Sequence, residues 1–151
     1  ADNVMALNNY AYYLSEEGKD LHKAEAMSYK TIKAEPNNGT YLDTYAWILF
    51  MEERYADAKT YIDQALKNRD STADNSTVLE HAGDIYYMNG IADESVDFWK
   101  KAYTGENQTE VLAWKIKNRQ YITEEELKKR NAPKQKPAAT KKSVRKGKKN
   151  K

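Results

Sequence analysis

The chain has 151 residues, of which 40% are hydrophobic and 32% are charged, and its formal net charge is +2. This length is sufficient for one domain with a hydrophobic core. The sequence contains no cysteine, which excludes disulfides and thiolate chemistry, and it has no apolar run near the ~20 residues of a membrane-spanning helix.

The first predicted element is a helical hairpin. Apolar residues at helical spacing from Leu7 to Leu14 predict its first helix, which Gly18 should end. We expect Asp20 to cap the second helix and Pro36 to stop it. The chain shows no signal peptide before this hairpin and enters the first helix almost at once. We therefore expect it to be the C-terminal part of a longer protein.

The central hairpin is predicted over residues 39–70, where two helices flank a short polar turn. Ala46 and Ala58 are small at the places where these helices should cross closely. Residues 52–54 contain no apolar side chain, so we expect them to turn in solvent. Residues 45–51 are apolar almost all the way round the helix, which is unusual for a helix with one wet face.

A third hairpin follows the polar loop over residues 70–75. Thr77 with Glu80 three positions later matches a capping box, which predicts the start of its first helix. Gly83 occupies the place of the small crossing residue in this helix. The third hairpin therefore repeats the pattern of the central one.

A further amphipathic helix is predicted over residues 109–119. Repeat arrays need such a terminal helix, because the last hairpin would otherwise expose its apolar side. We expect Leu112 and Ile116 to face inward and Lys115 to face solvent. Thr123 can then start one more short helix before prolines stop it.

The end of the chain differs in charge from the rest. Twelve of the 25 basic residues lie between 127 and 151, a segment without acids. Residues 1–126 therefore hold 13 basic and all 23 acidic residues, a formal charge of −10. We expect residues 123–151 to form a disordered basic tail. Such a tail either solubilises the protein or neutralises phosphates of nucleic acid or of an anionic membrane.

The three hairpins recur at a nearly constant interval. The small residue of the first helix recurs after 35 and 37 residues, and that of the second helix after 34 and 37 residues. These residues are Ala11, Ala46 and Gly83 in the first helices and Ala24, Ala58 and Ser95 in the second. Over about residues 4–107 the sequence resembles the tetratricopeptide repeat family, whose period is ~34 residues. It departs from the family pattern at Ser28, where a large aromatic residue is usual.

This resemblance implies an all-α fold, in which helical hairpins stack into a right-handed solenoid closed by a capping helix. It implies a repeat domain over residues 1–122. The repeats are expected at about 4–38, 39–72 and 76–107, with the capping helix at about 108–120. Similar repeats occur in bacterial proteins that are often exported to the cell envelope, which slightly favours that compartment.

Catalysis is not expected, because the chain has only two histidines and no glycine-rich phosphate loop. His22 should lie exposed on the outer face of a helix. His81 shares a helical turn with Glu80 and Asp84, which fits either a metal or acid–base cluster or a polar wall of a groove. We favour the polar wall, since no fourth ligand is evident. We therefore predict no enzyme activity, no metal, no cofactor and no small-molecule substrate.

The family resemblance also implies a function. In tetratricopeptide repeats, the first helix of each hairpin lines a concave groove that binds peptides or partner helices. The implied groove residues are Asn8, Asn9, Tyr12, Asp43, Trp47, Phe50, Met51, Glu80, His81, Asp84, Tyr87 and Met88. Trp47 and Phe50 have an alternative role, which is to fill the core between repeats. The prediction is a non-catalytic protein-binding module, monomeric or weakly oligomeric.

The groove residues also predict the chemistry of the partner. Asp43, Glu80 and Asp84 edge an apolar strip and have no lysine among the other groove residues. We therefore expect a partner that is basic and apolar. The alternative function is that of a nucleic-acid- or anionic-membrane-associated protein acting through its Lys/Arg tail.

Overall fold

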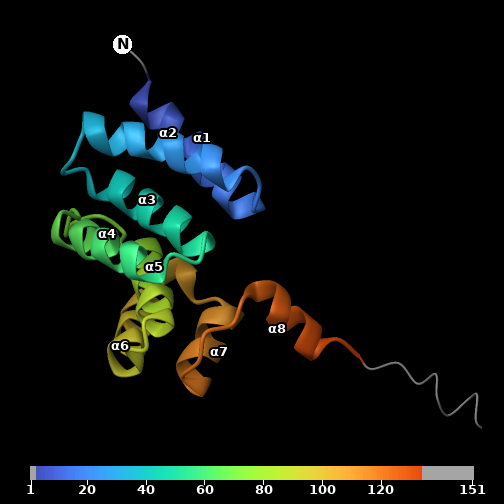
Figure 1. Ribbon diagram of the computed structural model, residues 1–151. Helices are drawn as coiled ribbons and strands as arrows, with labels where there is room; N and C mark the ends of the chain where they lie inside the picture. Colours follow the sequence, from blue (N-terminus) through green and yellow to red (C-terminus); the bar gives the residue numbers. More distant parts are fainter. Residues whose placement is uncertain (1–2, 134–151) are drawn as a thin grey trace, which may run out of the picture. The chain divides into compact units, whose positions relative to one another are not determined.

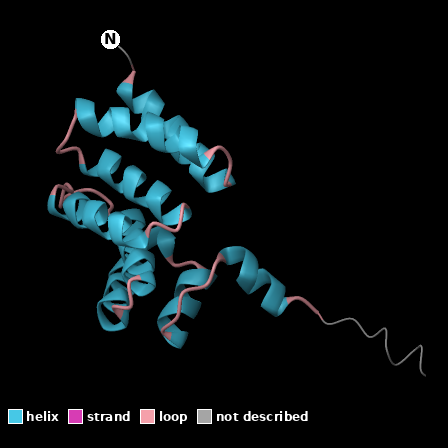
Figure 2. Cartoon of the chain, viewed as in Figure 1, coloured by secondary structure: helices cyan, strands magenta, loops and turns pink. Residues whose placement is uncertain are grey.

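The computed structural model describes residues 3–133, which form helices and connecting loops only (Figures 1 and 2). The chain divides into two compact units, Ala1–Tyr121 and Ile122–Lys151. Among the described residues, every helix is too short or too polar to cross a membrane. The helices of the first unit are α1 (Val4–Glu17), α2 (Leu21–Ala34), α3 (Gly39–Met51), α4 (Tyr55–Lys67), α5 (Ser76–Met88), α6 (Ala92–Ala102), the short 3-10 helix η1 (Gly105–Asn107) and α7 (Glu110–Asn118).

The first six helices pack as successive hairpins. α1 contacts α2, α3 contacts α4, and α5 contacts α6, while α2 and α4 also contact the helix that follows them. Figure 1 shows these pairs following one another from the blue to the yellow part of the chain. The prediction of an all-α fold of sequential hairpins is confirmed.

The helix crossings are made by small residues. Ala11, Ala46 and Ala58 are completely buried. A side chain on Gly83 would collide with the indole ring of Trp99, which is itself fully buried on α6. The small residue is needed here because an aromatic ring, rather than a neighbouring backbone, occupies the space.

α3 is the central helix of the unit. Nine of its 13 residues are buried, and it contacts α1, α2, α4 and α5. A helix with four neighbouring helices has almost no solvent-exposed face. This explains why residues 45–51 are apolar on all sides.

Two of the predicted helix caps differ in the structure. Asp20 precedes α2, but its side chain makes no capping hydrogen bond. Thr77 and Glu80 do not form a capping box, because α5 begins at Ser76. There Asp74 Oδ1 accepts a hydrogen bond of 2.9 Å from the Ser76 N–H.

Two charged residues that we expected in solvent are buried. Lys115 on α7 is only 2% exposed, although we expected it on the solvent-facing side of an amphipathic helix. The side chain of Glu52, in the turn between α3 and α4, is 9% exposed. Lys115 is buried because it pairs with Glu80 and Asp84 on α5. Glu52 is covered because the turn packs against His22 of α2, with Arg54 paired to its other oxygen.

The second unit contains α8 (Glu124–Asn131). Thr123 and Glu126 form a capping box: Thr123 Oγ1 accepts from the Glu126 N–H, and Glu126 Oε1 accepts from the Thr123 N–H, both at 3.0 Å. The prediction of a disordered tail from residue 123 fails over this helix, whereas the short helix starting at Thr123 is confirmed. Residues 134–151, which hold most of the basic tail, lie outside the described residues.

Candidate partner-binding groove

The first helices of the three hairpins, α1, α3 and α5, lie in sequence along one side of the first unit. α3 contacts both of the others. A hollow of about 570 Å³ lies where α3 and α5 begin and α1 passes them. Its polar lining includes six asparagines, which are Asn8, Asn9, Asn37, Asn38, Asn68 and Asn75.

Asn8 is the most constrained of these asparagines. It is 4% exposed, and its Oδ1 is buried without a hydrogen-bond partner among the described residues. A buried amide oxygen left without a donor costs about 1–3 kcal/mol. Such an oxygen on the wall of a hollow is suited to accept a hydrogen bond from a bound molecule.

Tyr12 lies one helical turn after Asn8 and also lines the hollow. Its burial, followed by the charges of Glu16 and Asp43, raises the pKa of the phenol. Tyr12 therefore remains a neutral hydroxyl that can donate or accept a hydrogen bond.

His81 on α5 pairs with Asp43 on α3. The distance between His81 Nδ1 and Asp43 Oδ1 is 2.8 Å. Burial alone lowers the pKa of His81, but the charges of Asp43, Asp84 and Glu80 outweigh it and raise that pKa above its ordinary 6.5. The pair joins the first helices of the second and third hairpins.

Trp47 stacks on His81, with ring centroids 4.0 Å apart. Its other contacts also lie within the unit: it stacks on Phe50 at 4.7 Å, and its Nε1 donates to Glu16 at 3.0 Å. Trp47 and Phe50 are 8% and 5% exposed. The two rings therefore fill space between the first helices.

Lys115 on α7 neutralises two groove carboxylates. Its Nζ contacts Asp84 Oδ1 at 2.7 Å and Glu80 Oε2 at 2.9 Å. Trp99 Nε1 donates to the same Asp84 oxygen at 2.9 Å. Burial opposes the charge of Lys115, but the two carboxylates outweigh it and raise the pKa of the ammonium. The lysine that the groove sequence lacks is thus supplied by the capping helix.

We compared the sequence and the structure with those of known proteins. No protein-family model matches the chain. A TPR (tetratricopeptide) repeat-containing protein of Pseudomonas aeruginosa is 35% identical over 66 residues, which are 44% of this chain and 11% of that protein. The N-terminal domain of stress-induced protein-1 (STI-1) from C. elegans superposes with a TM-score of 0.57 at 19% identity, covering 79% of this chain and 98% of that domain. The chain therefore has the fold of a tetratricopeptide repeat domain, and part of its sequence is similar to a tetratricopeptide repeat-containing protein.

This result confirms the family resemblance inferred from the period of the hairpins. Tetratricopeptide repeat domains are generally protein–protein interaction modules and are typically non-catalytic. The matched segment spans only 11% of the bacterial relative, so the function of that whole protein is not transferred.

The twelve residues predicted for the groove fall into different environments. Those that line the hollow are Asn8, Asn9, Tyr12 and Asp43. Those that are buried outside it are Trp47, Phe50, His81 and Asp84. Glu80, Met51 and Tyr87 are half-buried, and Met88 is exposed. Their role in partner binding stays a prediction.

Sequence reasoning missed part of the hollow. Asn37, Asn38, Asn68 and Asn75 line it but lie between helices, where asparagine is usual for turns. One sequence feature could have identified these asparagines. Each lies in the connection that precedes the first helix of a hairpin, either α3 or α5.

Proposed function

We propose that this protein is a non-catalytic interaction module that binds an extended segment of a partner protein in the hollow between α1, α3 and α5. The observation that supports this proposal is that Asn8 lines the hollow and that its buried Oδ1 has no hydrogen-bond partner among the described residues. In this proposal it accepts a backbone N–H of the partner.

The asparagine lining suits an extended peptide. Each carboxamide offers one acceptor and two donors, and an extended chain presents alternating N–H and C=O groups along its length. Asn8 and Asn9 on α1 and Asn68 after α4, which all line the hollow, can pair with both kinds of group. Recognition through the main chain tolerates many sequences, so the side chains of the partner must supply the specificity.

The charges at the hollow favour a basic segment. Asp43, Asp70 and Asp74 line it, and Arg69 is the cation among the lining residues. Glu80 and Asp84 contribute less than the sequence suggested, because Lys115 neutralises them. We therefore assign the preference for a basic and apolar partner to the hollow, rather than to the aromatic half of the groove.

Selection of binders from a random peptide library with the full chain tests this proposal. Peptides that bind should carry Lys or Arg, and Asn8→Leu should weaken them by at least ~10-fold, the equivalent of one lost hydrogen bond in a buried site. Asn118→Leu is the matched control, because Asn118 is exposed on α7 and does not line the hollow. Unchanged affinity for a folded Asn8→Leu variant, or saturable binding of acidic peptides instead, would contradict the proposal.

A further inference from the structure

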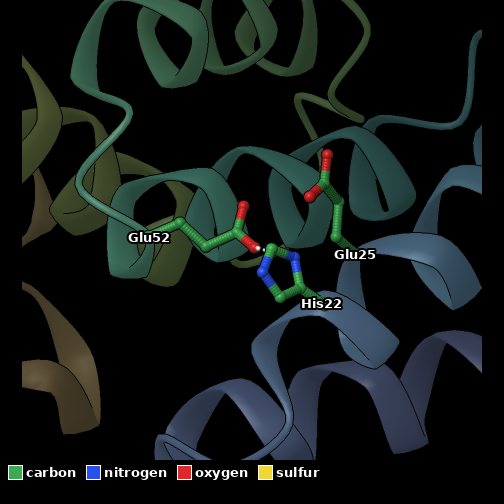
Figure 3. A group of neighbouring side chains, drawn as sticks. All are labelled: His22, Glu25 and Glu52. Carbon is green, nitrogen blue, oxygen red and sulfur yellow. Dashed lines mark ion pairs between the residues drawn. The ribbon is translucent and has the colours of Figure 1, made fainter.

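A second group of side chains lies away from the hollow, between the first and second hairpins. His22 and Glu25 are one turn apart on α2, and Glu52 follows the C-terminal end of α3 (Figure 3). One potential ligand atom from each residue lies within 4.8 Å of those of the other two. Figure 3 shows the imidazole of His22 lying between the two carboxylate side chains.

The side chain of Glu52 provides the observation that points to a bound cation at this cluster. Its side chain is 9% exposed, and its Oε2 is buried without a hydrogen-bond partner among the described residues. That oxygen faces His22 Nδ1 at 3.7 Å. Burial, followed by the proximity of Glu25, raises the pKa of the Glu52 carboxyl. A buried carboxylate oxygen without a donor is unfavourable unless a cation reaches it.

Arg54 does not fill this role. Its Nη1 contacts Glu25 Oε2 at 3.0 Å and Glu52 Oε1 at 3.3 Å, and the Tyr45 hydroxyl donates to the same Glu25 oxygen at 3.3 Å. These contacts hold both carboxylates in place but leave Glu52 Oε2 unengaged. Two carboxylates against one guanidinium also leave the cluster one negative charge when His22 is neutral.

We propose that His22, Glu25 and Glu52 form a binding site for a divalent transition metal ion of the Zn²⁺ type. The donor set is one imidazole nitrogen and two carboxylate oxygens, which zinc accepts in tetrahedral sites that keep a water in the fourth position. Magnesium and calcium prefer sites built of oxygen alone. The exposed His22 side chain closes the site over the two fixed carboxylates.

The ion would link the first hairpin to the second. α2 and α3 already pack on each other, and the proposed ligands come from both sides of that contact. An ion that binds only the folded chain raises its stability by mass action. The same link would fix the position of α1 and α3, which both line the hollow.

Zinc titration of the full, untagged chain tests the proposal. We expect one ion per chain, a rise in the thermal midpoint, and a shift of the His22 ring signals in NMR spectra. His81, the other histidine of the chain, is buried against Asp43 and serves as an internal reference that should not move. Mg²⁺ at the same concentration should leave both histidines unchanged.

Variants identify the ligands. His22→Ala and Glu52→Gln should each weaken Zn²⁺ binding by at least ~10-fold, the lower bound for loss of a group that holds a metal site together. Glu53→Gln is the matched control, since Glu53 is the adjacent, exposed carboxylate outside the cluster. His22 is fully exposed, so its loss leaves the fold intact and makes it the deciding variant. Unmoved His22 signals in excess Zn²⁺, equal binding by His22→Ala, or an equal response to Mg²⁺ would overturn the proposal.

Discussion

The two halves of the groove use their polar side chains in different ways. Around Asn8, at the beginning of α3 and α5, amide groups line a hollow, and one buried oxygen has no hydrogen-bond partner within residues 3–133. Around Asp84, on the later part of α5, each charge meets an opposite charge or a donor within 3 Å. The first half has unused bonding capacity, whereas the second half is part of the core.

This difference shows that residue type alone does not identify a binding surface. Trp47, Phe50 and His81 have the aromatic character of interface residues, yet they stack on one another and are buried. What identifies a candidate contact is a polar group that the protein itself leaves unsatisfied. The following predictions test this contrast, starting with the largest effect.

Lys115→Met should destabilise the half of the groove around Asp84. It leaves the buried Asp84 without its cation, and loss of one partner from a buried pair costs about 3–5 kcal/mol. We expect a fall of that size in the free energy of unfolding, measured by urea denaturation at neutral pH.

The control for this experiment is Lys117→Met, which removes an exposed lysine from the same helix and should change the stability little. Adding Asp84→Leu to Lys115→Met should restore most of the loss, because no buried charge then remains unpaired. If the single Lys115→Met variant were as stable as the parent, the Lys115–Asp84 pair would not stabilise this half of the groove.

Gly83→Leu should disturb the same half by overpacking. The new side chain would collide with the Trp99 ring, and overpacking of a core costs about 1–3 kcal/mol or more. The thermal midpoint should fall. Ala56→Leu, at an exposed helical position, should leave it nearly unchanged. Equal midpoints for the two variants would refute the close approach at Gly83.

The His81–Asp43 pair, which lies between the two halves, predicts a dependence of stability on pH. The folded-state pKa of His81 is raised above 6.5, so protonation stabilises the fold. This contribution is complete below pH 6.5 and is lost as the pH rises through the higher folded-state value. Urea midpoints compared between the parent and His81→Gln should show it.

Asp43→Asn provides the control for the pH experiment. Without that carboxylate, the main opposition to burial is gone, and burial favours the neutral imidazole. Stability should then rise, rather than fall, as the pH increases toward the ordinary pKa of 6.5 and stay constant above it. The same pH profile with and without Asp43 would show that Asp43 does not determine the protonation of His81.

Asn8→Leu should have the smallest effect on stability. Since Asn8 Oδ1 has no hydrogen-bond partner among the described residues, Asn8→Leu sacrifices no hydrogen bond to that atom. Relief of its burial cost offsets the loss of side-chain fit, so we expect the free energy of unfolding to change by less than ~1 kcal/mol. A loss of several kcal/mol in urea denaturation would show that Asn8 is a structural residue, and the contrast between the two halves would fail.

The sequence by itself determined the hairpins of this protein. Helix formation depends on local periodicity and on end signals, so Gly18 ends α1 as expected, and the interval between Ala11, Ala46 and Gly83 gave the repeat. The same local signals predicted the helix α7 and the short helix that starts after Thr123, but they placed a capping box at Thr77 that does not form. In the hollow, the family resemblance implied the residues on α1, whereas the asparagines between helices have the local signals of turn residues.

Only the tertiary structure decided which charged groups are buried. Lys115 and Asp84 are 31 positions apart, and His22 and Glu52 are 30 positions apart, so no local pattern connects them. A lysine or glutamate normally predicts solvent exposure, because an isolated charge is too costly to bury. The packing of successive hairpins brings carboxylates to Lys115 and offsets that cost, whereas at Glu52 it leaves one buried oxygen without a hydrogen-bond partner among the described residues. Whether each charged side chain is buried or exposed therefore depends on contacts that form only when the repeats stack.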